Sequence, residues 1–156
     1  MSTSLLYHGW RVRGYDHVAT RYEKGEIIFV IEHKPNSLRC PNCGGNDLIM
    51  RGKIPRRFVA PSIGRKPVGI ELAVQRVECR DCGVVRRVRL GFADPYRFYI
   101  RAFERLAIEL SRKMTIKDVA EHLMVSWDVI KGIVKRNLNR RLAKPKLHKL
   151  KRIAID

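Results

Sequence analysis

The sequence predicts an α+β protein with a β-rich first half and a helical second half. Short runs of alternating apolar residues lie between turn residues up to about residue 90, and apolar residues recur at helical spacing beyond it. In addition, all four cysteines fall in the β-rich part of the chain, in two pairs. Each half is small, so we expect each to have only a thin apolar core.

The β-rich half contains short strand patterns separated by turn signals. Residues 26–33 (EIIFVIEH) predict a strand, which follows a Lys-Gly turn at 24–25. Residues 68–78 alternate apolar and polar side chains, and residues 84–90 (VVRRVRL) predict a further, basic strand. The segment 53–67 is rich in Pro, Gly and Arg, so we expect it to be a loop with a basic surface.

The helical half begins at Asp94-Pro95. Aspartate is a good N-cap and proline suits the first position of a helix. From Tyr96 to Leu110 the apolar residues then form one stripe at helical spacing. We expect three helices between Pro95 and about Leu142.

The composition indicates a polyanionic partner. Lys and Arg number 33 against 15 Asp and Glu, which gives a net charge of +18 and a pI near 10.5. Nucleic acid is the partner that this excess favours. The longest apolar run, Ile27 to Ile31, is too short for a membrane span, and the chain start lacks the pattern of a secretory signal. We therefore expect no membrane partner and a cytoplasmic protein, whose thiols stay reduced.

The cysteines predict a structural zinc site. Cys40 and Cys43 form one C-x-x-C-G unit, and Cys79 and Cys82 form another. Four thiolates suit tetrahedral Zn(II) and leave no open position for chemistry. The distance between the pairs exceeds that of a compact zinc ribbon, so we expect a ribbon with an insertion. Two redox C-x-x-C motifs, or iron in place of zinc, are the alternatives, and His33 is expected to be a strand or surface residue.

Residues 115–138 have the spacing of a helix-turn-helix unit. Thr115 with Asp118 resembles a capping box, Met124-Val125 makes the turn, and Ser126 caps the second helix. Glycine is usual where Met124 stands, so the turn is either modestly strained or slightly longer. The inward-facing residues are expected to be Ile116, Val119, Ala120, Leu123, Ile130, Ile133 and Val134.

The second helix of this unit is expected to contact DNA in the major groove. Its basic residues can bind phosphates or guanine edges. The predicted contact residues are Trp127, Lys131, Lys135, Arg136, Arg140 and Arg141. Trp127 either touches a thymine methyl or sugar, or packs at the turn. A helical bundle with a solvated basic face is the alternative to DNA binding.

These patterns divide the chain into three parts. We expect a β-rich zinc-binding domain at 1–92, a helix-turn-helix domain at 93–143, and at 144–156 a basic linker followed by the first residues of another domain. The linker is expected to track phosphates on DNA, with a plain solvated tail as the alternative. The last residues, Ile153 to Asp156, resemble the start of a buried strand.

In this order the motifs resemble the N-terminal part of insertion-sequence transposases of the ISL-three family. The matching stretches are LRCPNCGG, VQRVECRDCGVV, GFADPYRFYIRAFERLAIEL, MTIKDVAEHLMVSWDVIKGIVKR and LKRIAID, which together run from about Tyr7 to Asp156. The resemblance implies that an RNase-H-like catalytic domain follows in complete family members, where a D-D-E carboxylate set holds two Mg(II) ions. Asp156 matches the first of these carboxylates.

The expected function is that of a DNA-binding transposase fragment that recognises the terminal inverted repeats of a transposon. One carboxylate cannot position two metal ions, so we expect no enzymatic activity from this chain alone. The expected cofactor is structural Zn(II), with Mg(II) only in a complete family member. The expected partners are double-stranded DNA and either a second copy of the chain or the full-length transposase, at the nucleoid in the cytoplasm.

Two other functions agree with part of the pattern. A small transcription regulator would combine a zinc ribbon with a helix-turn-helix, but would not end on the start of a buried strand. A basic zinc protein bound to RNA or the ribosome would explain the charge. The predicted reading helix argues against RNA, whose deep and narrow major groove excludes it.

Overall fold

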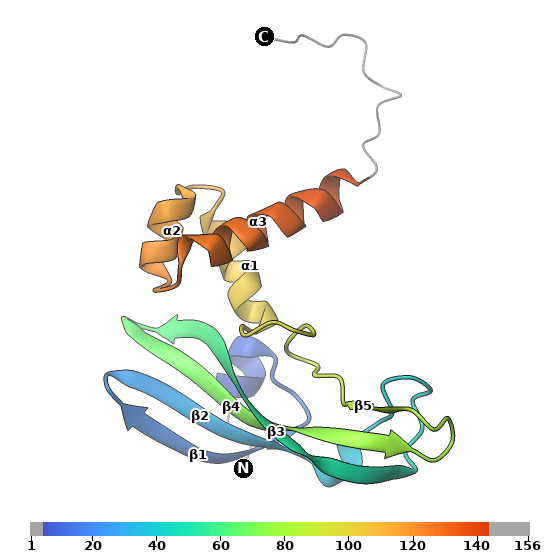
Figure 1. Ribbon diagram of the computed structural model, residues 1–156. Coiled ribbons are helices and arrows are strands. Elements are labelled where there is room, and N and C mark those ends of the chain that lie inside the picture. The colour runs from blue at the N-terminus through green and yellow to red at the C-terminus, as the bar shows by residue number, and fades with distance from the viewer. Residues whose placement is uncertain (1–4, 144–156) are drawn as a thin grey trace. The chain divides into compact units, whose positions relative to one another are not determined.

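The computed structural model describes residues 5–143, which fall into two compact units, one ending at Leu106 and the other beginning at Ala107. The α+β class is confirmed, with strands first and helices second (Figure 1). The strands are β1 (Tyr15–Glu23), β2 (Glu26–His33), β3 (Leu48–Ile63), β4 (Lys66–Cys79) and β5 (Val85–Arg87). The helices are α1 (Arg101–Leu110), α2 (Ile116–His122) and α3 (Trp127–Leu142), with short turns of helix at Leu5–Gly9 and Pro35–Ser37.

All five strands belong to one sheet, in the order β1-β2-β4-β3, with β5 paired to β4. The predicted turn at Lys24-Gly25 joins β1 and β2 into a hairpin. Lys24 and Gly25 both adopt positive φ, 49° and 80°, as a two-residue turn of this kind requires. β2 then runs parallel to the first part of β4, and β5 pairs with its last part. The predicted strands at 26–33 and 68–78 are confirmed, whereas the one at 84–90 is shorter.

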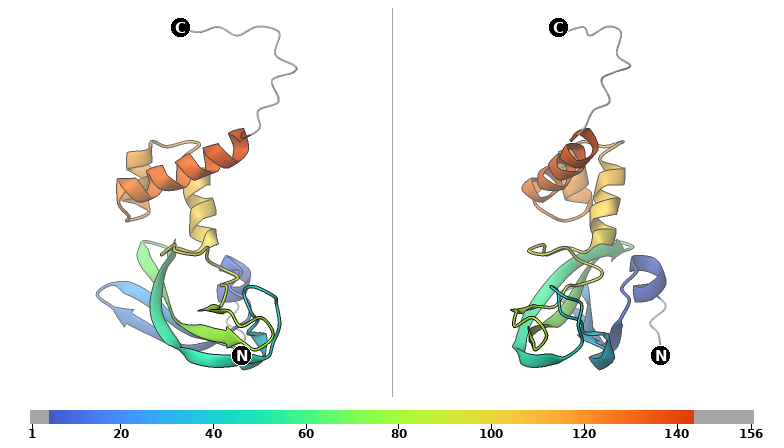
Figure 2. Two further views of the ribbon diagram at one scale, coloured as in Figure 1. Left: turned by 45° about the vertical axis from the view of Figure 1, so that its right-hand side comes forward. Right: turned by 90° about the vertical axis from the view of Figure 1, so that its right-hand side faces the viewer.

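The loop predicted at 53–67 is wrong, because most of that segment belongs to the long strand β3. This strand lies at the edge of the path β1-β2-β4-β3, where a proline need not donate to a second neighbour. Pro55 pairs with Ala73 inside the ladder. Pro61 falls in the irregularity between Ala60 and Ile63. Figure 2 shows β3 and β4 bending along their length, as bulges promote.

The helix predicted from Asp94-Pro95 is also wrong in its start, since α1 begins only at Arg101. Instead, the backbone just before α1 forms hydrogen bonds with β3. Val59 in β3 donates to the Phe98 carbonyl at 2.7 Å and accepts from the Ile100 amide at 2.9 Å. Asp94 does not cap a helix beside it, because its carboxylate pairs with Arg101 at 2.7 Å.

Much of the core of the first unit lies on one face of the sheet. Phe58 and Ile70, neighbours across β3 and β4, are fully buried. Phe92 packs edge-on against Phe58, with ring centroids 5.3 Å apart. Burying each such side chain contributes about 1.5–3 kcal/mol.

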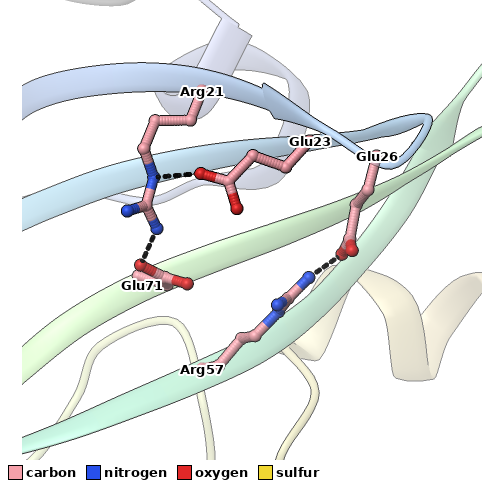
Figure 3. Close-up of polar contacts among 5 residues, drawn as sticks. All are labelled: Arg21, Glu23, Glu26, Arg57 and Glu71. Carbon is pink, nitrogen blue, oxygen red and sulfur yellow. Dashed lines mark hydrogen bonds and ion pairs between the residues drawn. The ribbon is translucent and has the colours of Figure 1, made fainter.

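Charged side chains cover the opposite face near the β1–β2 turn (Figure 3). Arg21 on β1 pairs with Glu71 on β4, and Arg57 on β3 pairs with Glu26 on β2. The second pair lies over Gly69, where an added Cβ would stand 3.0 Å from the Arg57 side chain. These partly exposed pairs are individually weak, but they shield the backbone of the central strands.

The second unit is built on α2 and α3. Val119 from α2 and Ile130 and Ile133 from α3 are fully buried, and Ala120 and Leu123 are buried as well, which confirms most of the predicted inner face. Ile116 and Val134 are half-buried. Among residues 5–143, no helix has both the length and the apolar character needed to cross a membrane.

His33, at the end of β2, gives a testable pH dependence. Its Nε2 is buried without a hydrogen-bond partner. Burial, and then the charge of Lys53, lowers the pKa of His33 from its ordinary value of 6.5. As the pH falls below about 6.5, His33 takes up a proton in the unfolded chain but not in the native protein. The free energy of unfolding should therefore fall as the pH drops.

Urea unfolding at about pH 7 and about pH 5.5, with zinc held constant, measures this effect. The loss of stability between the two pH values should be smaller in His33→Asn than in the wild type. An equal loss in both proteins would contradict the assignment to His33.

Candidate zinc centre and nucleic-acid interface

The structure brings the four cysteine sulfurs together at one point. All four Sγ atoms lie within 4.8 Å of one another. The distance is 3.6 Å between Cys40 and Cys82, and 3.5 Å between Cys43 and Cys79. A tetrahedral Zn(II) with bonds of about 2.3 Å spaces its sulfurs about 3.8 Å apart. The donor set and its spacing therefore fit a structural zinc ion, and His33 is not part of the group.

Two similar turns hold the sulfurs in place. In the first, the Gly44 amide donates to the Cys40 carbonyl at 3.0 Å, and in the second the Gly83 amide donates to the Cys79 carbonyl at 2.8 Å. Both glycines adopt positive φ, 79° and 68°, which L side chains rarely do. This explains why a glycine follows the second cysteine of each pair.

The turns also join the strands. The second turn connects β4 to β5, because Cys79 ends β4 and its amide donates to the Val84 carbonyl at 3.1 Å. Cys79 also pairs with Leu48 at the start of β3. The sulfur cluster thus holds the ends of three strands in register.

The environments of the sulfurs differ. Hydrogen bonding, led by the backbone of Cys43, lowers the pKa of Cys40 to about 6. Burial raises the pKa of the Cys79 thiol to about 12. The first group is therefore ready as a thiolate near neutral pH, whereas a metal ion must displace a proton from the second.

Sequence reasoning missed two residues beside the sulfurs, Asp81 and Gly45. A Cβ at Gly45 would lie 2.2 Å from Asp81 Oδ2, so the carboxylate packs directly on this glycine. The same carboxylate is 3.8 Å from Cys79 Sγ. The second glycine of the run at 44–45 was the only sequence signal for this packing.

The turn between α2 and α3 is the modestly strained form, not the longer one. Met124 adopts a left-handed φ of 54°. Its amide donates to the Glu121 carbonyl at 3.2 Å, and the Val125 amide donates to the Ala120 carbonyl at 3.0 Å. This pair of bonds is a Schellman motif, which ordinarily has glycine at the left-handed position.

The helix starts are capped unequally. Thr115 Oγ1 accepts from the Asp118 amide at 3.2 Å, which confirms the predicted cap of α2. Ser126 does occupy the N-cap position of α3, but its side chain makes no capping hydrogen bond. The predicted side-chain cap there is wrong, and the backbone carbonyl of Ser126 accepts from Val129 instead.

The outward face of α3 combines aromatic and basic groups. Trp127 is 45% exposed, so it is not a core residue. Lys131 lies one turn on, with its Nζ 4.4 Å from the centre of the indole ring. Lys135 follows after another turn and is exposed. These three side chains lie opposite the buried Ile130 and Ile133.

The other predicted contact residues lie elsewhere on α3. Arg136 is only partly exposed and folds back, with Nη1 3.3 Å from a Cβ built on Gly132. Arg140 and Arg141 are exposed in the last turn of the helix. The DNA contacts of all six residues stay predictions, and Asp156 lies outside the described residues.

Known families match both halves of the chain. A family described as the zinc-finger of transposase IS204/IS1001/IS1096/IS1165 matches residues 37–82, which span the four cysteines. A second, the helix-turn-helix domain of transposase family ISL3, matches residues 88–136. The chain belongs to the ISL3 transposase family. Searches of curated proteins and of solved structures returned no match.

Membership of the ISL3 family agrees with the geometry of both the cysteine group and the helix-turn-helix. The zinc-finger match covers the cysteine group, and the sequence resemblance to this family is confirmed. The helix-turn-helix match covers the capped α2, the left-handed turn and the first part of α3. Together they support structural zinc and DNA binding by this part of an ISL3 transposase.

Removing one sulfur should remove the metal. In Cys79→Ser the buried hydroxyl is a poor ligand, so we expect loss of stoichiometric zinc and a lower melting temperature. Metal analysis of the purified wild type should find one zinc per chain. Full zinc occupancy in Cys79→Ser, or no zinc in the wild type, would contradict the centre described here.

Met124→Gly should stabilise the second unit. The left-handed conformation costs an L-residue about 1–2 kcal/mol, and the greater flexibility of unfolded glycine offsets about 0.5–1 kcal/mol of the relief. We expect a gain of about 0.5–1 kcal/mol in the free energy of unfolding. Urea unfolding measures it, with Met114→Gly, an exposed methionine outside this turn, as the control that should bring no gain.

Proposed function

We propose that this ISL3 transposase chain recognises the terminal inverted repeats of its transposon through α3. The observation that carries the proposal is the face formed by Trp127, Lys131 and Lys135 on the second helix of a capped helix-turn-helix. That helix is the one that enters the major groove in proteins of this type. The proposal covers binding only, and assigns no strand-transfer step to residues 5–143.

The side chains of this face have suitable chemistry for DNA. Lysines contact phosphates or guanine edges, and an indole ring packs on sugars and on thymine methyl groups. The cation–π contact between Lys131 and Trp127 restricts both side chains before DNA arrives, which reduces the entropy lost on binding. Arg136, Arg140 and Arg141 lie on the flanks and at the end of α3, where we propose that they bind the phosphate backbone.

We propose further that the four cysteines are the ligands of a structural zinc ion and take no part in chemistry. A shell of four thiolates is closed, so the ion has no position for a water or a substrate. Its role is to hold the ends of β3, β4 and β5 together. The net charge of +18 supports the association of the whole chain with a polyanion.

A paired substitution on α3 tests the DNA-binding proposal. In Lys131→Gln/Lys135→Gln, helix propensity is kept and two positive charges are removed. If both lysines bind phosphates, the slope of log affinity against log salt should become shallower by about 0.9 for each phosphate. If they bind bases, discrimination between the inverted repeat and an unrelated duplex should fall by about 1–3 kcal/mol for each.

The matched control is Arg65→Gln/Lys66→Gln, at the exposed turn between β3 and β4. It removes the same charge far along the sheet from the cysteines. Affinity is measured by fluorescence anisotropy over a range of salt concentrations. If the α3 variant and the control behave alike on every duplex, α3 is not the reading helix.

A further inference from the structure

A second basic surface, separate from the face of α3, lies within the first unit. It is a groove of about 690 Å³ between the sheet and the segment that follows β5. We call it the β4–β5 groove, and its basic lining residues are Arg56, Arg76, Arg86 and Arg87. The exposed Tyr96 stands at its rim.

Two of these arginines face each other across the sheet. Arg76 on β4 and Arg87 on β5 are directly paired in antiparallel register. The amides of Cys79 and Val88 donate to Val84 and Gln75 on either side, so the Arg76–Arg87 pair is a non-hydrogen-bonded one, whose side chains lie closest. Like charges directly opposite each other destabilise a sheet.

No acid on the described part of the chain compensates this pair. Neither Arg76 nor Arg87 forms an ion pair within residues 5–143, and both are exposed. The one acid that lines the groove is Asp94, and Arg101 already binds its carboxylate at 2.7 Å. Folding therefore places two uncompensated guanidinium groups side by side.

Contacts within the protein already position Arg56, and the backbone conformation of Tyr96 leaves its ring exposed. Arg56 donates to the Arg97 carbonyl at 2.7 Å and lies 4.9 Å from the centre of the Phe58 ring. Tyr96 is 89% exposed and adopts a left-handed φ of 61°. This conformation is uncommon for a bulky residue, and it leaves a large aromatic ring in solvent beside the arginines.

We infer that the β4–β5 groove is a second DNA contact, in which Arg76 and Arg87 bind the phosphate backbone of duplex DNA. Guanidinium groups match phosphate oxygens in a bidentate manner, and a phosphate between them turns the repulsion into attraction. Tyr96 then lies beside the sugar-phosphate backbone. The inference rests on the proposed function, because it assumes that the chain binds DNA.

The sulfur cluster determines whether this groove exists. The turn at Cys79–Cys82 joins the two strands that carry Arg76 and Arg87, and it is closed by the Gly83 and Cys79 backbone bonds. Without a clip at that end, the repulsion between the guanidinium groups would separate a strand as short as β5. The cluster thus serves DNA binding indirectly, by holding the arginines together.

The test compares Arg76→Gln/Arg87→Gln with the control Arg65→Gln/Lys66→Gln in the full zinc-loaded chain. Binding to a labelled duplex is followed over a range of salt concentrations. We expect the groove variant to weaken binding to every duplex, cognate or not, and to reduce the salt slope by about 0.9 for each phosphate that an arginine no longer neutralises. The control should keep the wild-type slope.

A second variant separates a binding role from a structural one. Arg87→Glu sets a carboxylate opposite Arg76, so the melting temperature should equal or exceed that of the wild type while DNA affinity falls below that of Arg87→Gln. If the groove has no role in binding, Arg87→Glu should bind DNA as tightly as the control does, whatever its melting temperature. That result would overturn the inference.

The outcomes also separate this inference from the proposed function. If the wild type binds duplex DNA and the groove variant matches the control, the groove inference alone fails. If the α3 variant matches the control while the groove variant loses affinity, the proposed role of α3 fails and the groove stands. A wild type that does not bind duplex DNA, or binds RNA more tightly, overturns both.

Discussion

The convergence of four cysteine sulfurs is the constraint on which the first unit depends. Their turns fix the end of β4 against the starts of β3 and β5. The pairing of these three strands continues from that point. A unit of this size buries a smaller fraction of its surface than a larger domain does. A metal bound at the cluster adds stability that the core alone does not provide.

Positive charge opposes that stability, and its placement has a pattern. Acidic residues neutralise arginines on the sheet face near the β1–β2 turn, where Arg21, Arg57 and three glutamates form ion pairs. No such neutralisation occurs within residues 5–143 for Arg76 and Arg87, which the structure holds opposite each other. Charges left together at a cost to folding indicate a binding surface, because a bound polyanion recovers that cost.

Several features of the fold followed from local chemistry. The hairpin at Lys24-Gly25, the capping of α2 by Thr115 and the inner faces of α2 and α3 all depend on residues close in sequence. The failures at residues 53–67 and 95–100 were at places where distant segments compete for the backbone. β3 reads as a loop because its prolines forbid a central strand, and only its edge position makes them acceptable. Residues 95–100 have a helical sequence pattern, but Phe98 and Ile100 form backbone hydrogen bonds with Val59 of β3 instead of helical ones.

The sequence by itself predicted the four cysteines as metal ligands, the two kinds of unit, the helix-turn-helix and a polyanionic partner, because spacing, capping and net charge are local or additive properties. Only the tertiary structure decided that Trp127 is exposed, with Lys131 over its ring, and that Met124 adopts a left-handed backbone conformation. It also decided that Arg76 faces Arg87, eleven positions apart in the sequence but directly paired in the sheet. Strand register sets such neighbours, and here the turn at the cysteines sets the register.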